Sequence, residues 1–383
     1  MPDASVVSAV RISSYDPSAV REALDKLLEP IGGPDAFVDK NAPALLKPNF
    51  LRPAGIESAL TTHPAVIRAV AKICFEAGAR PVQISDSPGV GTAIRCAERL
   101  GIECTVSEFE VLDADDPVIC ESVAKDFAQI RLSKRMLKSP ALINLAKLKT
   151  HAQMGMTLSV KNLFGAVVGM DKIQWHYRAG RDPLKFAELV VRIYELVSPR
   201  LNLVDGIIGM EGNGPGSGTA RPAGFLMAST NGHALDTVVC RALGIDPMSV
   251  YTLRAAEQLG LFAQDNPITV VGDPIARFRP HPPWKSARPF HTRTMGPKWL
   301  TPVLSHLLTV LPTINRHKCT VCRRCIRHCA AEAMRFVDTP PLGAIRIDKK
   351  KCISCFCCQE ICPEGAISVK SSKLAEMLGI GIR

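Results

Sequence analysis

Eight cysteines near the carboxyl end of the chain have the spacing of iron–sulfur ligands. The first four, which follow the pattern C-x2-C-x2-C-x3-C, are Cys319, Cys322, Cys325 and Cys329. The pattern is repeated, just before Pro363, by Cys352, Cys355, Cys358 and Cys362. This spacing lets one tight loop supply three thiolates to a four-iron cube, with a fourth thiolate arriving from elsewhere. Two complete copies predict two [4Fe-4S] clusters as the cofactors.

The segment from about residue 315 to residue 370 closely resembles the bacterial two-cluster ferredoxin domain. In that family the fourth cysteine of each pattern binds the other cluster. The resemblance implies two ligand sets, Cys319, Cys322 and Cys325 with Cys362, and Cys352, Cys355 and Cys358 with Cys329. Ala330 stands where the family usually has proline, so only the local turn departs from the pattern.

Three features of this segment leave alternatives open. Zinc also binds C-x2-C pairs, but two complete four-cysteine runs favour iron–sulfur clusters. Cys357 is interpreted as a small buried residue or, after oxidative damage, as a substitute ligand. The positive side chains around the first pattern either dock an acidic electron-transfer partner or are solvated. They are Lys318, Arg323, Arg324, Arg327 and His328.

A second group of reactive side chains follows short apolar runs in the first 274 residues, as in ALLKPNF, VQISD and ALINLAKLKTH. Ligands of open parallel α/β sheets bind beyond the carboxyl ends of strands, so these side chains are expected to line a crevice. The residues predicted to bind a ligand are Lys47, Asn49, Asp86, Lys149, Asn162 and Asn213. Those predicted to act in catalysis are His151, His176, Lys161 and Glu211.

The chemistry of these residues indicates an anionic small molecule as the ligand. Lysines hold carboxylates or phosphates, and histidines exchange protons near neutral pH. Solvation of each lysine at the surface is the alternative. A catalytic metal held by Asp86, His151, His176 and Glu211 is a further alternative, although no H-x3-H or H-E-x2-H spacing supports it.

A glycine-rich segment, GMEGNGPGSG at residues 209–218, lies next to Glu211. Its glycines let backbone amides approach a ligand closely. The segment matches neither a P-loop nor the G-x-G-x-x-G dinucleotide pattern. It is therefore interpreted either as a binding loop or as a tight structural loop.

The elements that must position these residues alternate between helical and strand patterns. Helices are predicted in DPSAVREALDKLLEP after Asp16, in THPAVIRAVAKICFEAGA with Thr62 as cap and Gly78 past its end, and in RDPLKFAELVVRIYELVSP after Asp182. Strands are predicted at 44–50, 82–85, 141–146, 201–209, 224–230 and 268–273. This alternation predicts an α/β fold with a largely parallel sheet.

Composition divides the chain into four parts. These are an α/β domain at 1–274, a proline-rich basic linker at 275–314, a small α+β ferredoxin domain at 315–370 and a tail at 371–383. Within the linker, WLTPVLSHLLTVLP at 299–312 is predicted to be a helix packed on the body, with an interfacial membrane contact as the alternative.

The amino terminus shows no secretory signal, and no apolar run reaches the roughly 18 residues of a membrane span. We therefore expect a cytoplasmic protein. The formal net charge of +11 is compatible with an acidic redox partner or an anionic substrate. Nucleic acid is not expected, because no basic run is interleaved with aromatic residues.

Several long motifs in the first 274 residues resemble the Domain of Unknown Function 362 family. They are, in order, LKPNFL, TTHPAVIRAV, GARPVQISDSPG, INLAKLKTHAQMGMTLSVKNLFG, VDGIIGMEGNGPGSG and ITVVGD. The resemblance implies an iron–sulfur protein whose reaction is not established. The positions that match the family pattern are Lys47, Asn49, Asp86, Lys149, His151, Lys161, Asn162, His176, Glu211, Asn213 and Asp236.

These observations lead to three hypotheses. In the first, the ferredoxin domain passes single electrons to the crevice, and the chain is an oxidoreductase of unknown substrate. In the second, the chain is an electron carrier whose large domain is a docking scaffold for another enzyme. In the third, the α/β domain is a metal-dependent enzyme and the clusters are regulatory.

Overall fold

A mixed, mostly parallel sheet forms the centre of the larger domain. The computed structural model describes residues 4–124, 127–169, 171–288, 310–339, 343–372 and 381–382. In spatial order, the strands of the sheet are β11 (Ile268–Gly272), β1 (Ser5–Arg11), β10 (Thr219–Ser229), β9 (Leu201–Glu211), β7 (Ala141–His151), β2 (Ala44–Pro48), β3 (Val82–Asp86) and β4 (Glu110–Asp113). The short β8 (Gly155–Thr157) pairs with β7 beside this row. The predicted α/β fold with a largely parallel sheet is confirmed.

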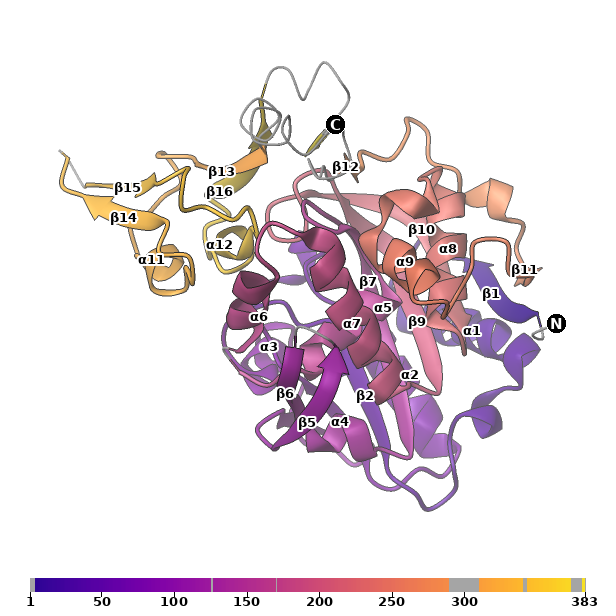
Figure 1. Cartoon of the computed structure of the whole chain (residues 1–383). Helices are drawn as coiled ribbons and strands as arrows, with labels where there is room; N and C mark the ends of the chain where they lie inside the picture. Colours follow the sequence, from indigo (N-terminus) through magenta and orange to yellow (C-terminus); the bar gives the residue numbers. More distant parts are fainter. Residues whose placement is uncertain are drawn as a thin grey trace.

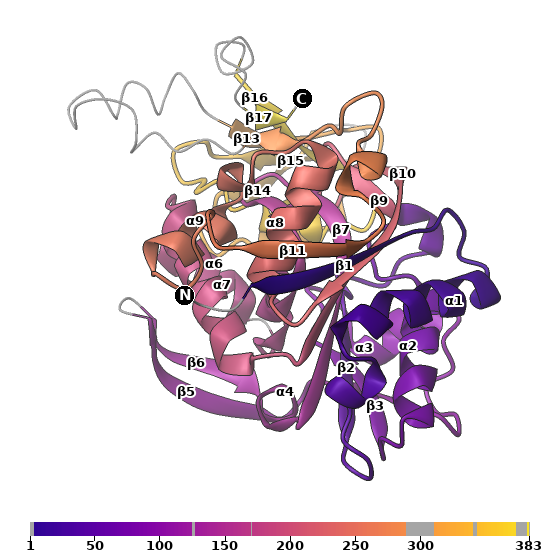
Figure 2. The same ribbon diagram turned by 90° about the vertical axis from the view of Figure 1, so that its right-hand side faces the viewer.

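The strands from β4 to β9 run in one direction, so their carboxyl ends meet at one edge. β10 is antiparallel to β9 and β1, and β11 joins β1 in parallel at the far edge (Figure 2). The register places Lys47 beside Asn144, and Asn144 beside Asn202. Three neighbouring strands thus place polar side chains in one row, at the carboxyl end of β2.

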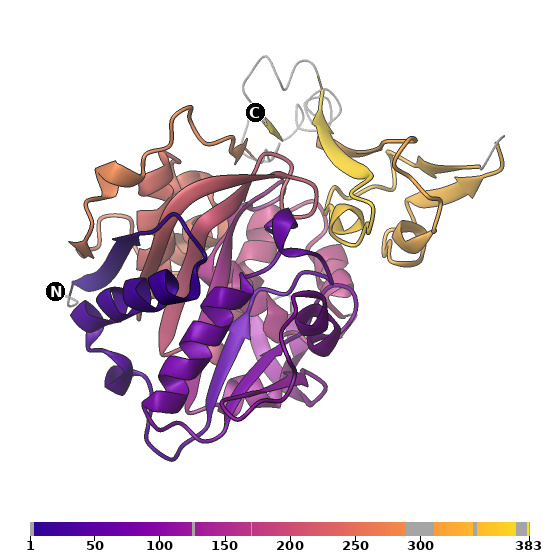
Figure 3. The ribbon, with the colours of Figure 1, turned by 180° about the vertical axis from the view of Figure 1, so that it is seen from behind.

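Helices cover both faces of the sheet (Figures 1 and 3). One apolar cluster is formed with α1 (Pro17–Leu28), α2 (Pro64–Glu76) and α3 (Ala93–Arg99). The other is formed with α7 (Pro183–Val197), α8 (Gly232–Leu243), α9 (Tyr251–Gln258) and the hairpin of β5 (Pro117–Ala124) and β6 (Phe127–Ser133). The remaining helices of this domain are α4 (Lys134–Lys138), α5 (Ser159–Asn162) and α6 (Asp171–Ala179). A sheet buried on both faces needs apolar residues on both, which explains its continuous hydrophobic runs.

The helix boundaries follow the predicted caps except at one helix. Asp16 accepts hydrogen bonds from the first amides of α1, and Asp182 does the same for α7. Thr62, however, does not cap α2. The cap is His63, whose Nδ1 accepts from the amide of Ala65. The Thr62 hydroxyl is used elsewhere, because it accepts from Asn49 N and donates to Leu145 O.

Two central strands are longer than predicted. β7 continues to His151 and β9 to Glu211, so the polar residues expected after these strands belong to the strands themselves. β8 pairs with the end of β7, and β10 pairs with the end of β9. These neighbours satisfy the backbone groups and extend both strands past the apolar run.

Short antiparallel pairs and one-turn helices form the small domain. β13 (Val310–Ile314) pairs with β16 (Ile367–Ser371), and β14 (Met334–Val337) pairs with β15 (Ala344–Ile347). The helices α11 (Arg324–Arg327) and α12 (Cys357–Glu360) each lie within one cysteine pattern. A separate pair joins β12 (Ala287–Arg288) to β17 (Gly381–Ile382). The predicted small ferredoxin-like region is confirmed, and its first strand begins inside the segment predicted as linker.

Residues 299–309 of the predicted linker helix lie outside the described residues, and residues 310–312 belong to β13. Among the helices that the structure describes, none is long and apolar enough to span a bilayer.

Candidate functional site

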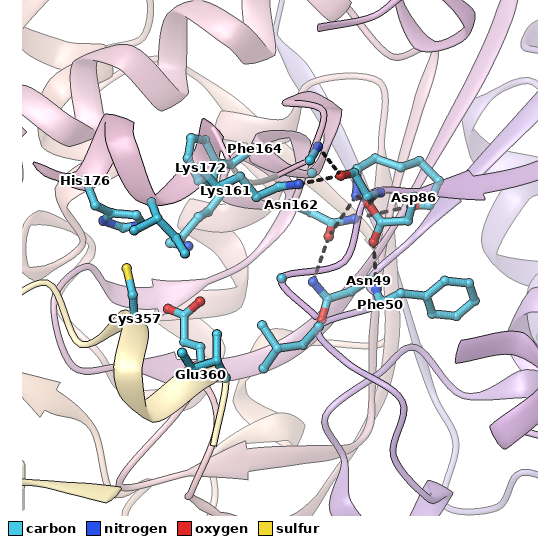
Figure 4. Close-up of a pocket in the computed structure, with 18 residues that line it drawn as sticks. Asn49, Phe50, Asp86, Lys161, Asn162, Phe164, Lys172, His176, Cys357 and Glu360 are labelled. Carbon is cyan, nitrogen blue, oxygen red and sulfur yellow. Dashed lines mark hydrogen bonds and ion pairs between the residues drawn. The ribbon is translucent and has the colours of Figure 1, made fainter. Parts of the chain in front are cut away.

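The carboxyl ends of β2 and β3 open into a cavity of about 90 Å³. Its walls come from the segments that follow these strands, from α5 and α6, and from α12 of the small domain (Figure 4). The polar side chains that line it are Lys47, Asn49, Asp86, Ser87, Lys161, Asn162, Lys172, His176, Cys357 and Glu360. We call this cavity the crevice. It has room for several waters or a small molecule.

A buried ion pair forms one wall of the crevice. Lys47 Nζ lies 2.7 Å from Asp86 Oδ1, and both side chains are almost fully buried. Asp86 also accepts from the amides of Phe50 and Ser87. A Cβ at Gly165 would lie 2.3 Å from Asp86 Oδ1, so glycine is needed for this close approach. Burial lowers the pKa of Lys47 and Asp86 opposes that shift, so the lysine is held by the pair.

A chain of amide side chains fixes the position of α5. Asn49 Nδ2 donates to Asn162 Oδ1 at 2.9 Å, and Asn162 Nδ2 donates to Asn144 Oδ1 at 2.8 Å. Asn144 in turn donates to Asn202 and to Ser159 O. Asp236 on α8 accepts from the amides of Ser159 and Val160, the first residues of α5. Asp236 therefore positions α5 and does not line the crevice, and burial raises its pKa to about 7.

Two lysines near the crevice are held by hydrogen bonds to different partners. Lys149 is buried and donates to Asn49 Oδ1 and Leu60 O, without lining the crevice. Lys172 lines it and donates to Ser87 Oγ and Val167 O, both at 2.6 Å. Burial lowers the pKa of each of these two lysines to about 7.

Lys161 also lines the crevice, and its amino group is available to a ligand. Burial lowers its pKa, and Glu360 opposes that shift. Within the described residues its Nζ makes no hydrogen bond or ion pair, and it lies 5.8 Å from the centroid of the Phe164 ring. Figure 4 shows Lys161 on the same wall as Lys172 and His176, across from Glu360.

His151 is fully buried beside Glu360 of the small domain. Its Nδ1 accepts from the amides of Gln153 and Met154, so the proton lies on Nε2, 3.2 Å from Glu360 Oε1. Burial and the nearby Lys161 lower the pKa of His151 to about 4. Burial alone would raise the pKa of Glu360, but His151 and Lys161 bring it to about 2. At neutral pH a neutral imidazole therefore faces a carboxylate.

His176 lines the crevice in a mostly apolar setting. Its ring stacks on Phe186 with centroids 3.9 Å apart and meets Phe164 edge to face. Burial lowers its pKa to about 3, so the ring is neutral. Its Nδ1 is buried without a hydrogen-bond partner among the described residues. A buried polar nitrogen beside a cavity is suited to binding a ligand.

Glu211 and Asn213 lie away from the crevice. Glu211 forms an ion pair with Arg221 at 2.7 Å and accepts from the amide of Lys285. Asn213 contacts the small domain, where its backbone oxygen accepts from Gln359 and its Oδ1 accepts from the amide of Val369. The structure thus does not bring Glu211 together with Asp86, His151 and His176.

The glycine-rich segment docks the small domain. A Cβ at Gly216 would lie 2.8 Å from the backbone oxygen of Gln359, so only glycine fits against α12 without a shift. Ser217 donates to Ile367 O, and the guanidinium of Arg52 donates to Glu360 O at 2.9 Å. Arg181 donates to Cys352 O at 2.8 Å. These contacts hold the second cysteine pattern against the α/β domain.

The cysteines line two separate cavities in the small domain. The first cavity is lined by Cys319, Cys322, Cys325 and Cys362. The second is lined by Cys329, Cys352, Cys355, Cys357 and Cys358. Each cavity thus takes its fourth pattern cysteine from the other motif, as the crossed ligand sets require, and its remaining lining is mostly apolar. The residues fit a pair of iron–sulfur clusters.

Within the described ranges, no group of three or more His, Cys, Asp or Glu side chains is placed to hold a single metal ion. In a four-iron cluster each thiolate binds a different iron, so these thiols need not converge on one point.

Two polar residues of the crevice, Cys357 and Glu360, come from the small domain and were not among the predicted site residues. Cys357 was interpreted as buried or as a substitute ligand; it is buried, and it lines both the second thiol cavity and the crevice. No local pattern marks Glu360, because its role depends on domain docking. Lys172 lies in the sequence between two predicted site residues, Lys161 and His176, and this proximity was the available signal.

The fold and the site define a class of protein in which a 4Fe-4S dicluster domain is docked at the carboxyl edge of an α/β sheet. Residues 311–363 match the 4Fe-4S dicluster domain. Residues 44–241 match the family described as Domain of unknown function (DUF362). The chain belongs to this family, and it carries an iron–sulfur domain.

One curated relative is a thylakoid-associated protein of Synechocystis sp., which is 40% identical over 262 residues, covering 67% of this chain and 79% of the relative. Two solved structures are similar at 13% identity, a protein of Thermotoga maritima with a TM-score of 0.38 and the lactate racemase apoprotein of Thermoanaerobacterium thermosaccharolyticum with 0.41. The matches cover 65% and 62% of this chain, and 59% and 57% of those chains, so the chain spans less than two thirds of either solved protein.

Proposed function

We propose that this chain is an iron–sulfur oxidoreductase that exchanges single electrons between a redox partner and an anionic small molecule bound in the crevice. The observation that carries the proposal is the position of Cys357, a residue that lines both the second thiol cavity and the crevice. A molecule in the crevice would therefore lie one side chain away from a cluster site.

In this proposal the two cavities hold two [4Fe-4S] clusters with the crossed cysteine sets. When bound, such clusters supply or accept electrons one at a time. The protein orients the redox domain through Arg52 and Arg181, whose guanidinium groups bind the backbone of the second cysteine pattern. Transfer to the crevice is then intramolecular, which removes the need for a second encounter.

The side chains of the crevice have separate tasks. Lys161 binds the anion, because its ammonium is free of hydrogen bonds and ion pairs within the described residues. Lys172, with a pKa of about 7, donates or takes up the proton that accompanies an electron. His176 is neutral and orients the ligand through its unpartnered Nδ1. Lys47 and Asp86 keep the wall in place.

A titration with inorganic sulfate tests the proposal. An anion beside the clusters disfavours an added electron, so saturating sulfate should lower the reduction potential of at least one cluster. A coupling of about 1 kcal/mol corresponds to roughly 40 mV for a one-electron couple. The measurement is an anaerobic potentiometric titration followed by electron paramagnetic resonance.

The matched variants are Lys161→Met in the crevice and Lys138→Met on the exposed side of α4. We expect the sulfate effect to be lost in the first and retained in the second. If the wild-type protein binds no sulfate, or if both variants keep the full shift, the crevice is not an anion site. A chain that only carries electrons to a partner would give that result.

A further inference from the structure

A second cavity, of about 660 Å³, lies at the outer junction of the two domains. Its α/β side is formed by Arg52 and Pro53 and by α3 with Arg95 and Arg99, and its small-domain side by Arg324 and Pro363. We call it the arginine groove. Four arginines line it against one acidic residue, Glu98.

The arginines of the groove differ in what they bind. Arg52 is mostly buried, and its guanidinium donates to the backbone oxygens of Glu360 and Gly216. In the described part of the chain, no ion pair involves Arg95, Arg99 or Arg324. Arg95 and Arg99 are exposed. The groove is thus a positive surface with a single acidic lining residue, Glu98.

The groove adjoins the first thiol cavity. Arg324 and Pro363 line both spaces. Arg324 directly precedes Cys325, and Pro363 directly follows Cys362; both cysteines line the first thiol cavity. The same cavity includes Cys322, which is exposed. An occupant of the groove would therefore lie next to the first cysteine set.

We propose that the arginine groove is the docking site of an acidic protein that carries single electrons. The clusters exchange one electron at a time, which suits a one-electron carrier rather than a hydride donor. Encounter complexes between redox proteins are small and depend on complementary charge. This proposal identifies the redox partner of the function proposed above. It rests on that function only for where the electrons go after they have reached the clusters.

The test uses an acidic bacterial flavodoxin as the probe and the full holoprotein. In the double variant Arg95→Glu with Arg99→Glu, the dissociation constant for flavodoxin at low ionic strength should rise by about tenfold or more, with a weaker dependence on salt. The rate of cluster reduction by flavodoxin hydroquinone should fall by a similar factor. Reduction by photoreduced deazariboflavin, a small neutral donor, should not change.

The control is Lys134→Glu with Lys138→Glu on α4, which changes the net charge by the same amount at exposed positions outside the groove. Equal weakening by both double variants would mean that only net charge matters, and the groove would be rejected. Unchanged flavodoxin binding in the arginine variant, with loss of inorganic phosphate binding, would assign the groove to a small anion instead. Neither readout requires a ligand in the crevice, so failure here is distinct from failure of the sulfate titration.

Discussion

At the scale of single residues, Cys357 differs from its neighbours although it lies between two predicted cluster ligands. It is not part of the repeated cysteine pattern, and its thiol faces the crevice beside Glu360 (Figure 4). We expect Cys357→Ser to keep about eight irons per chain, whereas Cys358→Ser should keep about four. Iron and acid-labile sulfide analysis of anaerobically prepared protein checks this. The reverse pattern would make Cys357 the ligand.

The pKa of Lys172 predicts how anion binding depends on pH. Burial brings this pKa to about 7, so the ammonium is present below pH 7 and lost above it. If sulfate binds only the ammonium form, its dissociation constant should rise about tenfold between pH 6 and pH 8. Sulfate keeps its charge over this range, so the change reports the protein.

In Lys172→Met, sulfate binding should be weaker at pH 6, and its pH dependence should flatten to about threefold or less. Calorimetric titrations at both pH values give these constants. A wild-type dissociation constant that does not change with pH would rule out a titrating lysine in the site.

At the scale of elements, the glycine-rich segment acts on the crevice through the docking of α12. A methyl group at Gly216 would press on the backbone of Gln359 and Glu360. We expect Gly216→Ala to weaken docking by about 1–3 kcal/mol, as overpacking does elsewhere. Amide hydrogen exchange in residues 357–371 should then be about tenfold faster or more.

Gly260→Ala is the matched control for this variant. Gly260 has a positive φ and no neighbouring atom within 4 Å of an added Cβ, so the substitution strains the backbone away from the interface. It should leave exchange in residues 357–371 unchanged. Equal acceleration in both variants would show a general loss of stability rather than a loss of docking.

The parts of the fold that could be predicted from sequence are those set by local chemistry. Asp16 and Asp182 cap helices with their own side chains, and the apolar runs mark the central strands. Thr62 was misassigned because its hydroxyl binds Asn49 and Leu145, and no local rule shows these partners. Glu360 and Asn213 act through contacts between the two domains, which join residues about 150 or more positions apart in the sequence. Hydrophobic periodicity indicates only local structure, so it could not reveal these contacts.

At the scale of the whole molecule, shared lining residues link four spaces. The arginine groove shares Arg324 and Pro363 with the first thiol cavity, and the crevice shares Cys357 with the second. The two cysteine sets exchange their fourth members, Cys362 and Cys329, so the two cavities are neighbours. In the function proposed above, the groove would be the place where electrons enter and the crevice the place where they leave.

These links predict that removal of the first cysteine set and removal of the second have different effects on reduction by flavodoxin and on the sulfate shift. Without the first cluster, in Cys319→Ser with Cys322→Ser, flavodoxin should reduce the remaining cluster on the order of tenfold more slowly or worse, because the groove adjoins the first cysteine set. Sulfate should still shift its potential. Without the second cluster, in Cys352→Ser with Cys355→Ser, flavodoxin should reduce the first cluster at its normal rate, but sulfate should no longer shift the potential.

Stopped-flow reduction and potentiometry of both variants measure these effects, after iron analysis has shown about four irons in each. A photoreduced neutral donor controls for general damage, because it reaches either cluster without docking. If flavodoxin reduces both variants equally fast, or if sulfate shifts the potential of both, the two clusters are interchangeable. The groove and the crevice would then not be the two ends of one path, since a path requires that each end depends on its own cluster.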